Sequence, residues 1–295
     1  QERRMKLSSR KLVFNFSEWL HEYHCSIGGK QSIEVYAFIH PLCPQSWGME
    51  PLLKKLQLEY GKYICIKHIL SGNITQQQIH QPLSRVSSEA VPACSYREQY
   101  VGYRYESLPH NTSLAIKAAE LQGKKRGIRF LRKLQQYHFL KDKDLSNMDV
   151  LIECAEAVKL DVEEFIADIS SHIAEKALQS DFKVAEEMDV QEVPSLVFFN
   201  ANTDDEGIKV SGIYSYDIYK TILKEIMPSL PNPAPLPTIE SFIRFYHVST
   251  SQEVATVYNM NVRSVECEMK SLLKRNVVEK ILTDHGVFWK YQQTH

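Results

Sequence analysis

Hydrophobic residues near the start of the chain follow two different periods within one stretch. From residue 33 to 39 alternate positions are Ile, Val or Ala, and bulky Tyr36 and Phe38 fill positions between them, which predicts a strand buried on both faces. Apolar residues then recur at three- and four-residue spacing over 47–60, which predicts a helix. Pro44 suits the first turn of that helix, because the N–H it lacks would have no partner there. The stretch therefore predicts a strand, a tight turn and a helix.

Further strands and helices follow, in an order that predicts one α/β domain with a long helical insertion. Residues 63–70 predict a second buried strand, parallel to the first. Helical spacing then recurs in a series of segments, near 75–86, 112–122, 125–138, 147–158, 161–169 and 172–188. Strands at 196–199 and 208–212 and a helix over 215–227 complete the domain. Asn147 and Asp161 are predicted N-caps within the insertion.

A run of prolines divides the rest of the chain from this domain. Five prolines fall between residues 228 and 237, which favours an extended, semi-rigid spacer. Three further helices and a hairpin are predicted after it, the order of a winged-helix-like α+β module. We therefore expect the following parts: an N-terminal extension (1–30), an α/β domain (31–227) with its helical insertion (about 74–189), a Pro-rich linker (228–237) and a winged-helix-like domain (238–295).

Charge argues against a nucleic-acid partner. The formal net charge is −1, so no global attraction would hold a polyanion. Basic and acidic residues nearly balance in the C-terminal domain, and its third predicted helix carries Glu266 and Glu268, which would face phosphates unfavourably. We expect this domain to bind protein and not nucleic acid.

Cysteine usage and hydropathy favour a cytoplasmic protein without a membrane partner. The six cysteines are scattered with no close pair, which fits a reducing compartment better than a disulfide framework, and Cys65 and Cys154 are expected in the core. No apolar run approaches the ~20 residues of a membrane span. The basic first residues lead into no hydrophobic stretch, so no signal peptide is expected.

Cys43 is the candidate reactive residue. It directly precedes the predicted helix, where unpaired N–H groups and the helix dipole favour a thiolate. Ser46 stands where a second cysteine would complete a Cys-X-X-Cys motif, and one sulfur cannot form an internal disulfide. A single thiol still allows mixed disulfides with a partner or glutathione. If Ser46 replaced a natural cysteine, the dithiol interpretation would return.

A metal site near the N-terminus is a weaker hypothesis. His21, His24 and Cys25 carry imidazole and thiolate groups that bind zinc, but only three candidate ligands lie there. An exposed polar linker explains these residues more simply. We expect no metal and no cofactor.

Longer motifs resemble a known family. The run HPLCPQSWGMEP around Cys43, and an insertion ending in FKVAEEMDVQEVPSLVFFN with Val193 and Pro194, resemble the DsbA-like family of the thioredoxin superfamily. With the Pro-rich linker and the winged-helix-like tail, the chain resembles more narrowly the SpxH (YjbH) family of ClpXP adapter proteins of Gram-positive bacteria. The resemblance implies a thioredoxin fold in which Pro194 is cis and faces the Cys43 sulfur.

The same resemblance implies an adapter and not an enzyme. Such an adapter binds the transcription regulator Spx and promotes its degradation by the ClpXP protease, which it engages only indirectly. Cys43 and Ser46 would then form a degenerate redox motif without a catalytic residue, and no Spx-contacting residue is indicated. Two alternatives stay open: a DsbA-like thiol oxidoreductase or glutathione-dependent transferase using Cys43, and a winged-helix transcription regulator that senses redox state through Cys43.

Overall fold

The computed structural model describes residues 33–71, 109–203, 206–283 and 286–292. The first part of the chain contains, in order, β1 (Ile33–Ile39), α2 (Pro44–Tyr60), β2 (Ile64–Leu70), α4 (His110–Leu121), α5 (Lys124–Lys141), α6 (Met148–Ala157), α7 (Val162–Ile169), α8 (His172–Glu187), β3 (Ser195–Asn200), β4 (Ile208–Ser211) and α9 (Tyr216–Ile226). The C-terminal module contains α10 (Ile239–Tyr246), β5 (Val248–Thr250), α11 (Ser251–Tyr258), α12 (Val262–Lys274), β6 (Val278–Thr283) and β7 (Gly286–Tyr291).

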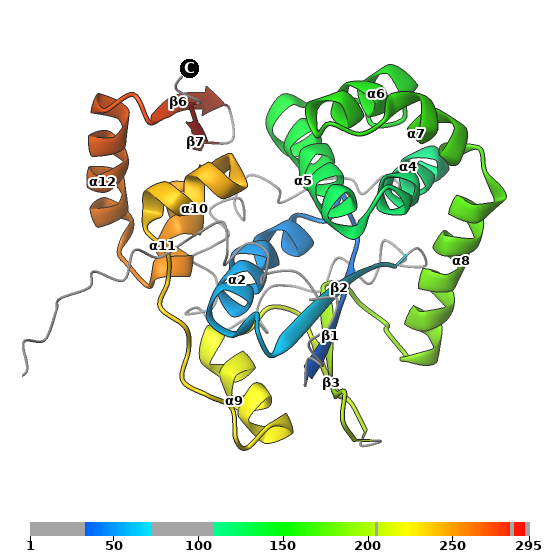
Figure 1. Cartoon of the computed structure of the whole chain (residues 1–295), viewed down its shortest axis with the longest axis horizontal. Helices are drawn as coiled ribbons and strands as arrows, with labels where there is room; N and C mark the ends of the chain where they lie inside the picture. Colours follow the sequence, from blue (N-terminus) through cyan, green and yellow to red (C-terminus); the bar gives the residue numbers. More distant parts are fainter. Residues whose placement is uncertain (1–32, 72–108, 204–205, 284–285, 293–295) are drawn as a thin grey trace, which may run out of the picture.

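A four-stranded sheet in the order β2-β1-β3-β4 lies at the centre (Figure 1). β1 pairs parallel with β2 and antiparallel with β3, and β4 pairs antiparallel with β3. Val35 and Ala37 pack with residues of α2 and α9, whereas Phe38 packs with Ala185 of α8. The prediction that β1 is buried on both faces is confirmed.

The helical insertion joins β2 to β3 and has a core of its own. α4 and α5 pack against each other and against α6 to α8 through buried side chains that include Leu114, Ala118, Phe130, Leu134, Leu151 and Phe165. These five helices lie at the predicted segments, while the segment at 75–86 falls outside the described residues. Both predicted N-caps are confirmed, because Asn147 accepts a hydrogen bond from the Asp149 N–H and Asp161 accepts one from the Glu164 N–H.

The C-terminal module combines three helices with a three-stranded antiparallel sheet in the order β5-β7-β6. The sequence predicted the helices and the β6–β7 hairpin but not β5, because a strand of three residues is too short to show a period of two. Trp289 of β7 is buried at the centre of the module, and its indole N–H donates to Ser251 Oγ at 2.8 Å. The winged-helix assignment remains a prediction.

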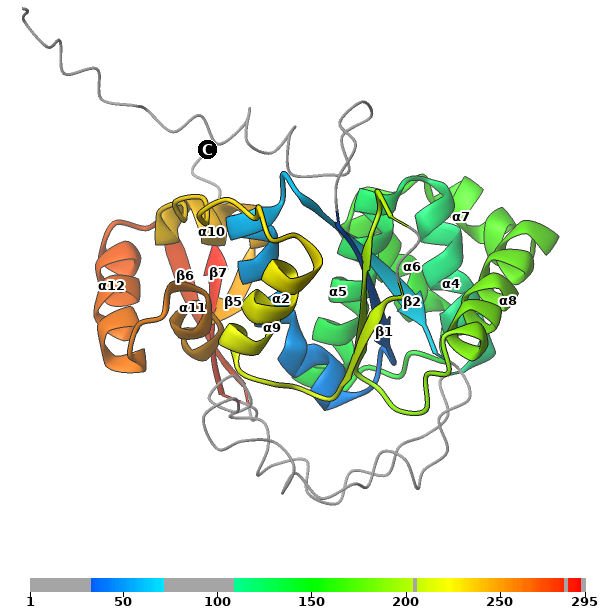
Figure 2. The ribbon, with the colours of Figure 1, turned by 90° about the horizontal axis from the view of Figure 1, so that it is seen from below.

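The module rests directly on α2, so that α2 lies between the central sheet and the module (Figure 2). Leu58 of α2 is part of the module's hydrophobic core. The Pro-rich segment runs back along α2, where the Ala234 N–H donates to the Glu59 carbonyl at 2.9 Å. The segment thus contacts α2, on which both modules bury apolar surface, and its role as a spacer between them remains a prediction.

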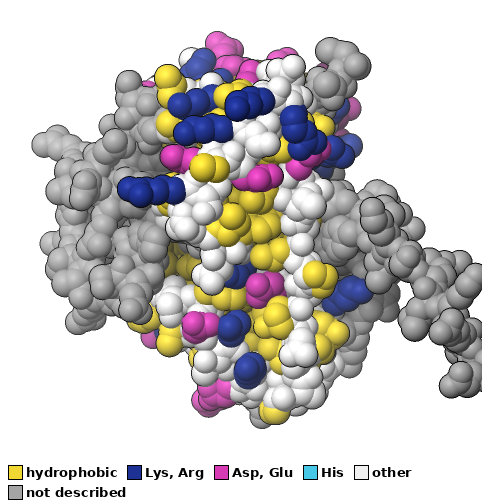
Figure 3. Space-filling view, turned by 90° about the vertical axis from the view of Figure 1, so that its left-hand side faces the viewer, with side chains coloured by type: hydrophobic (Ala, Val, Ile, Leu, Met, Phe, Trp, Pro, Cys, Tyr) yellow, Lys and Arg dark blue, Asp and Glu magenta, His cyan; other side chains and the backbone are white. Residues whose placement is uncertain are grey.

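Charges of both signs lie on the side of the molecule that carries α12 and α9. Lys and Arg gather toward one end of this side, Asp and Glu lie beside them, and hydrophobic side chains lie in the middle (Figure 3). On α12 the exposed Glu268 lies among exposed Arg263 and Lys270. This pattern gives no continuous basic track along α12.

Within the described part of the chain, no helix combines the length and apolar character that crossing a membrane requires.

Candidate functional site

Cys43 occupies the position that the sequence predicts, at the N-cap of α2. Its Sγ accepts a hydrogen bond from the Ser46 N–H at 3.4 Å, which satisfies one of the unpaired donors of the first turn. Ser46 Oγ accepts from the His40 N–H at 3.2 Å, tying the end of β1 to the start of α2. The Val193–Pro194 peptide is cis, the conformation that the family resemblance implies.

Burial decides what the Cys43 thiol can do. The residue is 0% exposed and belongs to an apolar cluster with Phe38, Ile69 and Val193, so its sulfur is covered. Thiol–disulfide exchange requires that one sulfur reach another in line. The buried geometry therefore allows no exchange with a partner unless the structure around Cys43 moves.

The imidazole of His40, which lies beside this motif, is not positively charged near pH 7. Burial, together with the nearby His138, lowers the pKa of His40 to about 4. His40 is consequently neutral near pH 7, and its Nδ1 accepts from the Leu42 N–H at 3.3 Å. In the described residues the site thus holds Cys43 and Ser46 in a folded turn, but no charged histidine next to them.

Other candidate residues divide between the core and the undescribed segments. His21, His24 and Cys25 lie outside the described residues, and the described ones contain no group of three or more His, Cys, Asp and Glu side chains placed to bind a metal. Cys154 is buried as predicted, and burial raises its pKa to about 12. Cys65 is also buried but is disulfide-bonded, which corrects the expectation of unpaired thiols.

A buried ionic network joins α2 to three other parts of the fold. Glu50 of α2 is 3% exposed and accepts from Arg132 of α5, whose Nε and Nη2 lie 3.2 and 3.1 Å from its Oε2. His68 Nε2 of β2 lies 3.4 Å from Glu50 Oε1. Burial acts to raise the pKa of Glu50, but the Arg132 and His68 charges prevail and hold it well below its ordinary value of 4.5. Glu50 is therefore ionised and tied to both α5 and β2.

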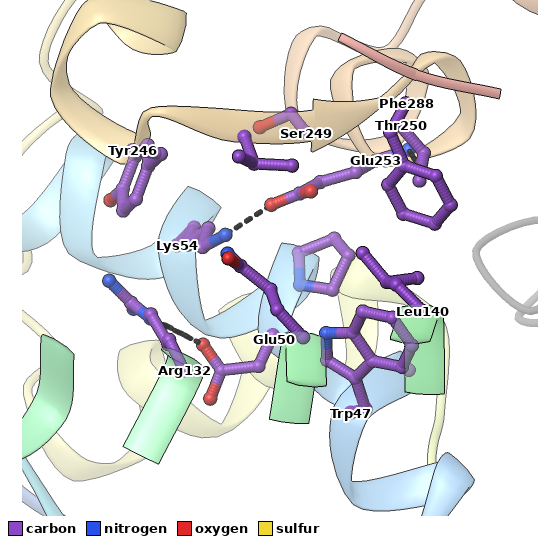
Figure 4. A pocket seen from close by; sticks show the side chains of 14 residues that line it. Trp47, Glu50, Lys54, Arg132, Leu140, Tyr246, Ser249, Thr250, Glu253 and Phe288 are labelled. Carbon is purple, nitrogen blue, oxygen red and sulfur yellow. Dashed lines mark hydrogen bonds and ion pairs between the residues drawn. The ribbon is translucent and has the colours of Figure 1, made fainter. Parts of the chain in front are cut away.

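One turn further along α2, Lys54 makes the corresponding link to the C-terminal module. Its ammonium forms an ion pair with Glu253 of α11 and lies 4.4 Å from the ring centre of Tyr246. The Arg132 guanidinium faces the same ring at 5.1 Å. Figure 4 shows Lys54 directed at Glu253, Arg132 directed at Glu50 and Tyr246 beside both cations. These charges connect the thioredoxin-like part, the helical insertion and the C-terminal module at one point.

A small cavity lies between these side chains and β5. Its volume is about 50 Å³, which accommodates a few waters and no larger ligand. Ser249 of β5 lines it and has a buried hydroxyl without a hydrogen-bond partner among the protein atoms. This junction is suited to holding the modules together and not to binding a substrate.

The sequence offered one signal for this junction. Glu50, Lys54 and Lys55 interrupt the apolar residues of α2 and all three are buried, although a helix with one buried face would expose them. The basic residues Lys124, Lys125 and Arg126 at the start of α5 are exposed, and Lys125 and Arg129 also line a cleft described below.

Comparisons with known proteins identify relatives of the whole chain. The family model described as "Thioredoxin" matches residues 36–221. The chain is 39% identical over 288 residues to the "ClpXP adapter protein SpxH" of Bacillus subtilis (strain 168), covering 95% of this chain and 96% of the relative. It is 40% identical over 279 residues to the protein of the same name from Shouchella clausii (strain KSM-K16), covering 90% and 91%.

Among solved structures, a similar fold occurs in a "putative protein disulfide isomerase from Nitrosomonas europaea". The TM-score is 0.52 at 14% sequence identity, over 68% of this chain and 100% of that one. This likeness supports the thioredoxin-like fold alone.

Proposed function

This chain belongs to the thioredoxin family and to the SpxH family of ClpXP adapter proteins, and from that membership we propose that it binds the transcription regulator Spx and promotes its degradation by ClpXP. The observation that carries the proposal is the extent of the match, since the identity of 39% spans 95% of this chain. It therefore includes the C-terminal module as well as the thioredoxin-like part.

Adapter action, and not catalysis, suits what surrounds the thioredoxin-like motif. Cys43 is buried and Ser46 supplies no second sulfur, so the motif lacks the exposed dithiol that an oxidoreductase cycles through. The motif instead contributes packing, because it joins β1 to α2, and α2 carries the C-terminal module.

Degradation of Spx by purified ClpXP is expected to accelerate several-fold when this protein is added in stoichiometric amounts. The physical reason is that an adapter raises the effective concentration of its client at the protease. The measurement is the half-life of Spx in the presence of ATP, with and without the adapter. A ClpXP substrate unrelated to Spx serves as the control and should be degraded at an unchanged rate. Unchanged Spx half-life together with no detectable Spx binding would refute the proposal.

Cys43→Ala is expected to leave this acceleration within about twofold of the unmodified protein. Its side chain is fully covered, so it offers no contact to Spx, and its loss removes only a small buried volume and one capping hydrogen bond. The degradation assay checks this result, with thermal unfolding to verify that the variant is folded. A folded variant that no longer supports degradation would show that the thiol takes part.

An assay of insulin reduction addresses the alternative of a DsbA-like thiol oxidoreductase. With the sulfur of Cys43 buried, we expect no turnover above that of the Cys43→Ala variant. Turnover at an enzyme-like rate that is lost in Cys43→Ala would favour the oxidoreductase instead.

A further inference from the structure

A cleft of about 800 Å³ separates the helical insertion from the C-terminal module. α5 and the end of α6 form one wall, and the end of α10 together with β6 and β7 forms the other. In Figure 1 this region lies between α5 and the β6–β7 hairpin. Ligand sites typically have volumes of about 300–1,000 Å³, so the cleft is large enough to hold a bound molecule. It adjoins the small cavity beside Glu253, with which it shares the lining residues Arg132, Gln136, Tyr246 and Val248.

Cationic side chains dominate the walls of the cleft. They are Lys125, Arg129, Arg132, Lys133, Lys159 and Lys290. Among the described lining residues there is one carboxylate, Glu279, and it accepts a hydrogen bond from the Lys290 ammonium at 2.6 Å. Among the described residues no carboxylate lies within ion-pair distance of Lys125, Arg129, Lys133 or Lys159. The fold therefore gathers four cations here, on α5 and just after α6, that no described carboxylate pairs with, whereas Arg132 is paired with Glu50.

The positive charges of the cleft lower the pKa values of basic groups beside them. Burial, followed by the charges of Arg129, Lys133 and Lys159, lowers the pKa of His247, which lies at the end of α10 in the same cleft. Burial and Arg129 likewise lower the pKa of Lys125. An anion bound in the cleft would relieve this repulsion.

The cleft also offers apolar surface close to the charges. Phe245 and Tyr291, both half-buried, line the wall of the C-terminal module, and Ile128 and Val158 line the wall opposite. Uncharged amides of Gln136 and Asn276 add hydrogen-bonding groups. A ligand that complements these walls carries carboxylates, an apolar side chain and backbone polar groups, which together describe a short acidic peptide.

Aromatic side chains in a basic groove can also stack on nucleobases. A single strand, however, needs a basic track that continues over several nucleotides, whereas the side of the molecule with α12 and α9 carries charges of both signs. The observations favour a peptide.

We propose that the cleft between α5 and the C-terminal module binds a short acidic peptide segment of a partner protein. The carboxylates would pair with Lys125, Arg129 and Lys133, and an apolar side chain would pack against Phe245 and Tyr291. The inference goes beyond the adapter function, because it concerns the chemistry of one site and holds whichever partner supplies the segment.

The test is fluorescence anisotropy of a labelled peptide of alternating acidic and apolar residues, titrated with the full chain. We expect saturable binding that weakens with added salt, and none to a peptide in which Gln and Asn replace Glu and Asp. The double variant Lys125→Glu/Arg129→Glu should weaken binding by at least about tenfold, or roughly 1.4 kcal/mol. Both side chains are exposed, so the substitutions leave the core intact.

A matched double variant on α8, Lys176→Glu/Lys183→Glu, changes the net charge equally at exposed positions that do not line the cleft. It should bind the peptide within about twofold of the unmodified chain. If both double variants lost the same affinity for the peptide, the change in net charge alone would explain the loss, and the proposal would be overturned. No binding of the acidic peptide would overturn it as well. So would tighter, Arg129-dependent binding of single-stranded DNA, which would assign the cleft to nucleic acid.

Discussion

Glu50→Ala is expected to lower the free energy of unfolding by about 3–5 kcal/mol, the cost of removing one partner from a buried ion pair. The carboxylate is 3% exposed and is shared by Arg132 and His68, with Lys54 one turn away on α2. Without it the Arg132 guanidinium loses this carboxylate and faces Lys54 in a buried setting. Chemical denaturation of the full chain measures the loss.

The control for this substitution is Glu187→Ala on α8. Glu187 pairs with Lys183 on an exposed surface, so its removal should change stability by no more than about 0.5 kcal/mol. A loss below about 1 kcal/mol in Glu50→Ala would contradict the role that we assign to the network.

The network also predicts a pH dependence with a definite sign. The folded-state pKa of Glu50 lies well below its ordinary value of 4.5, so the folded state binds fewer protons than the unfolded state at acid pH. The stability contributed by the ionised carboxylate is complete above about pH 4.5 and is lost as the pH falls toward the folded-state pKa. The stability difference between the unmodified chain and Glu50→Gln should therefore shrink on acidification below about pH 4.5. A difference that stays constant from neutral pH down to about pH 3 would contradict this assignment.

Lys117→Met is expected to destabilise the chain by a similar amount, about 3–5 kcal/mol at neutral pH. Lys117 of α4 is 2% exposed, and its ammonium lies 2.5 Å from Asp181 and 2.8 Å from Glu120. Asp181 of α8 also accepts from the Leu70 N–H at 2.8 Å, so this cation supports the contact between the helical insertion and the end of β2. Its removal leaves a buried carboxylate without a counter-charge.

The deficit of Lys117→Met, like that of Glu50→Gln, grows as the pH rises, but it does so above about pH 4, because it comes from a carboxylate whose folded-state pKa is raised. Burial raises the pKa of Asp181 above 3.8 even beside Lys117, and the loss of Lys117 raises it further. In the variant the folded state then binds more protons than the unfolded state, so stability falls as the pH rises from about 4 toward neutrality. Unfolding midpoints at about pH 5 and about pH 7.5 should show a larger deficit at the higher pH.

Lys183→Met, at an exposed pair on α8, is the control for Lys117→Met and should show almost no deficit at either pH. An equal deficit for Lys117→Met at the two pH values would mean that Asp181 does not respond to the lost charge.

Much of the fold could be predicted from local patterns. The described strands of the sheet and helices α4 to α8 lie within a few residues of their predicted ranges, because the period of apolar residues is a local property of each segment. The N-caps Asn147 and Asp161 were predictable for the same reason. β5 was not, because its three residues become a strand only by pairing with β7.

The site was harder to predict, because its character depends on what covers it. The sequence indicated a thiol at a helix N-terminus, and the structure places Cys43 there but buries it. The basic residues at the start of α5 have a pattern typical of a solvated helix start, and they line a cleft only because the C-terminal module lies opposite them.

The sequence by itself determined the strand–turn–helix around Cys43, the helical insertion and the family of the chain. Each of these depends on the spacing of apolar residues within a segment or on a sequence motif. Only the tertiary structure decided the role of α2. Leu58 and Lys54 lie on the side of that helix turned away from the sheet, and both are buried because the C-terminal module docks there. Burial and charge pairing here depend on residues nearly two hundred positions apart, such as Lys54 and Glu253. The spacing of apolar residues within one segment does not indicate which distant surface a side chain will contact.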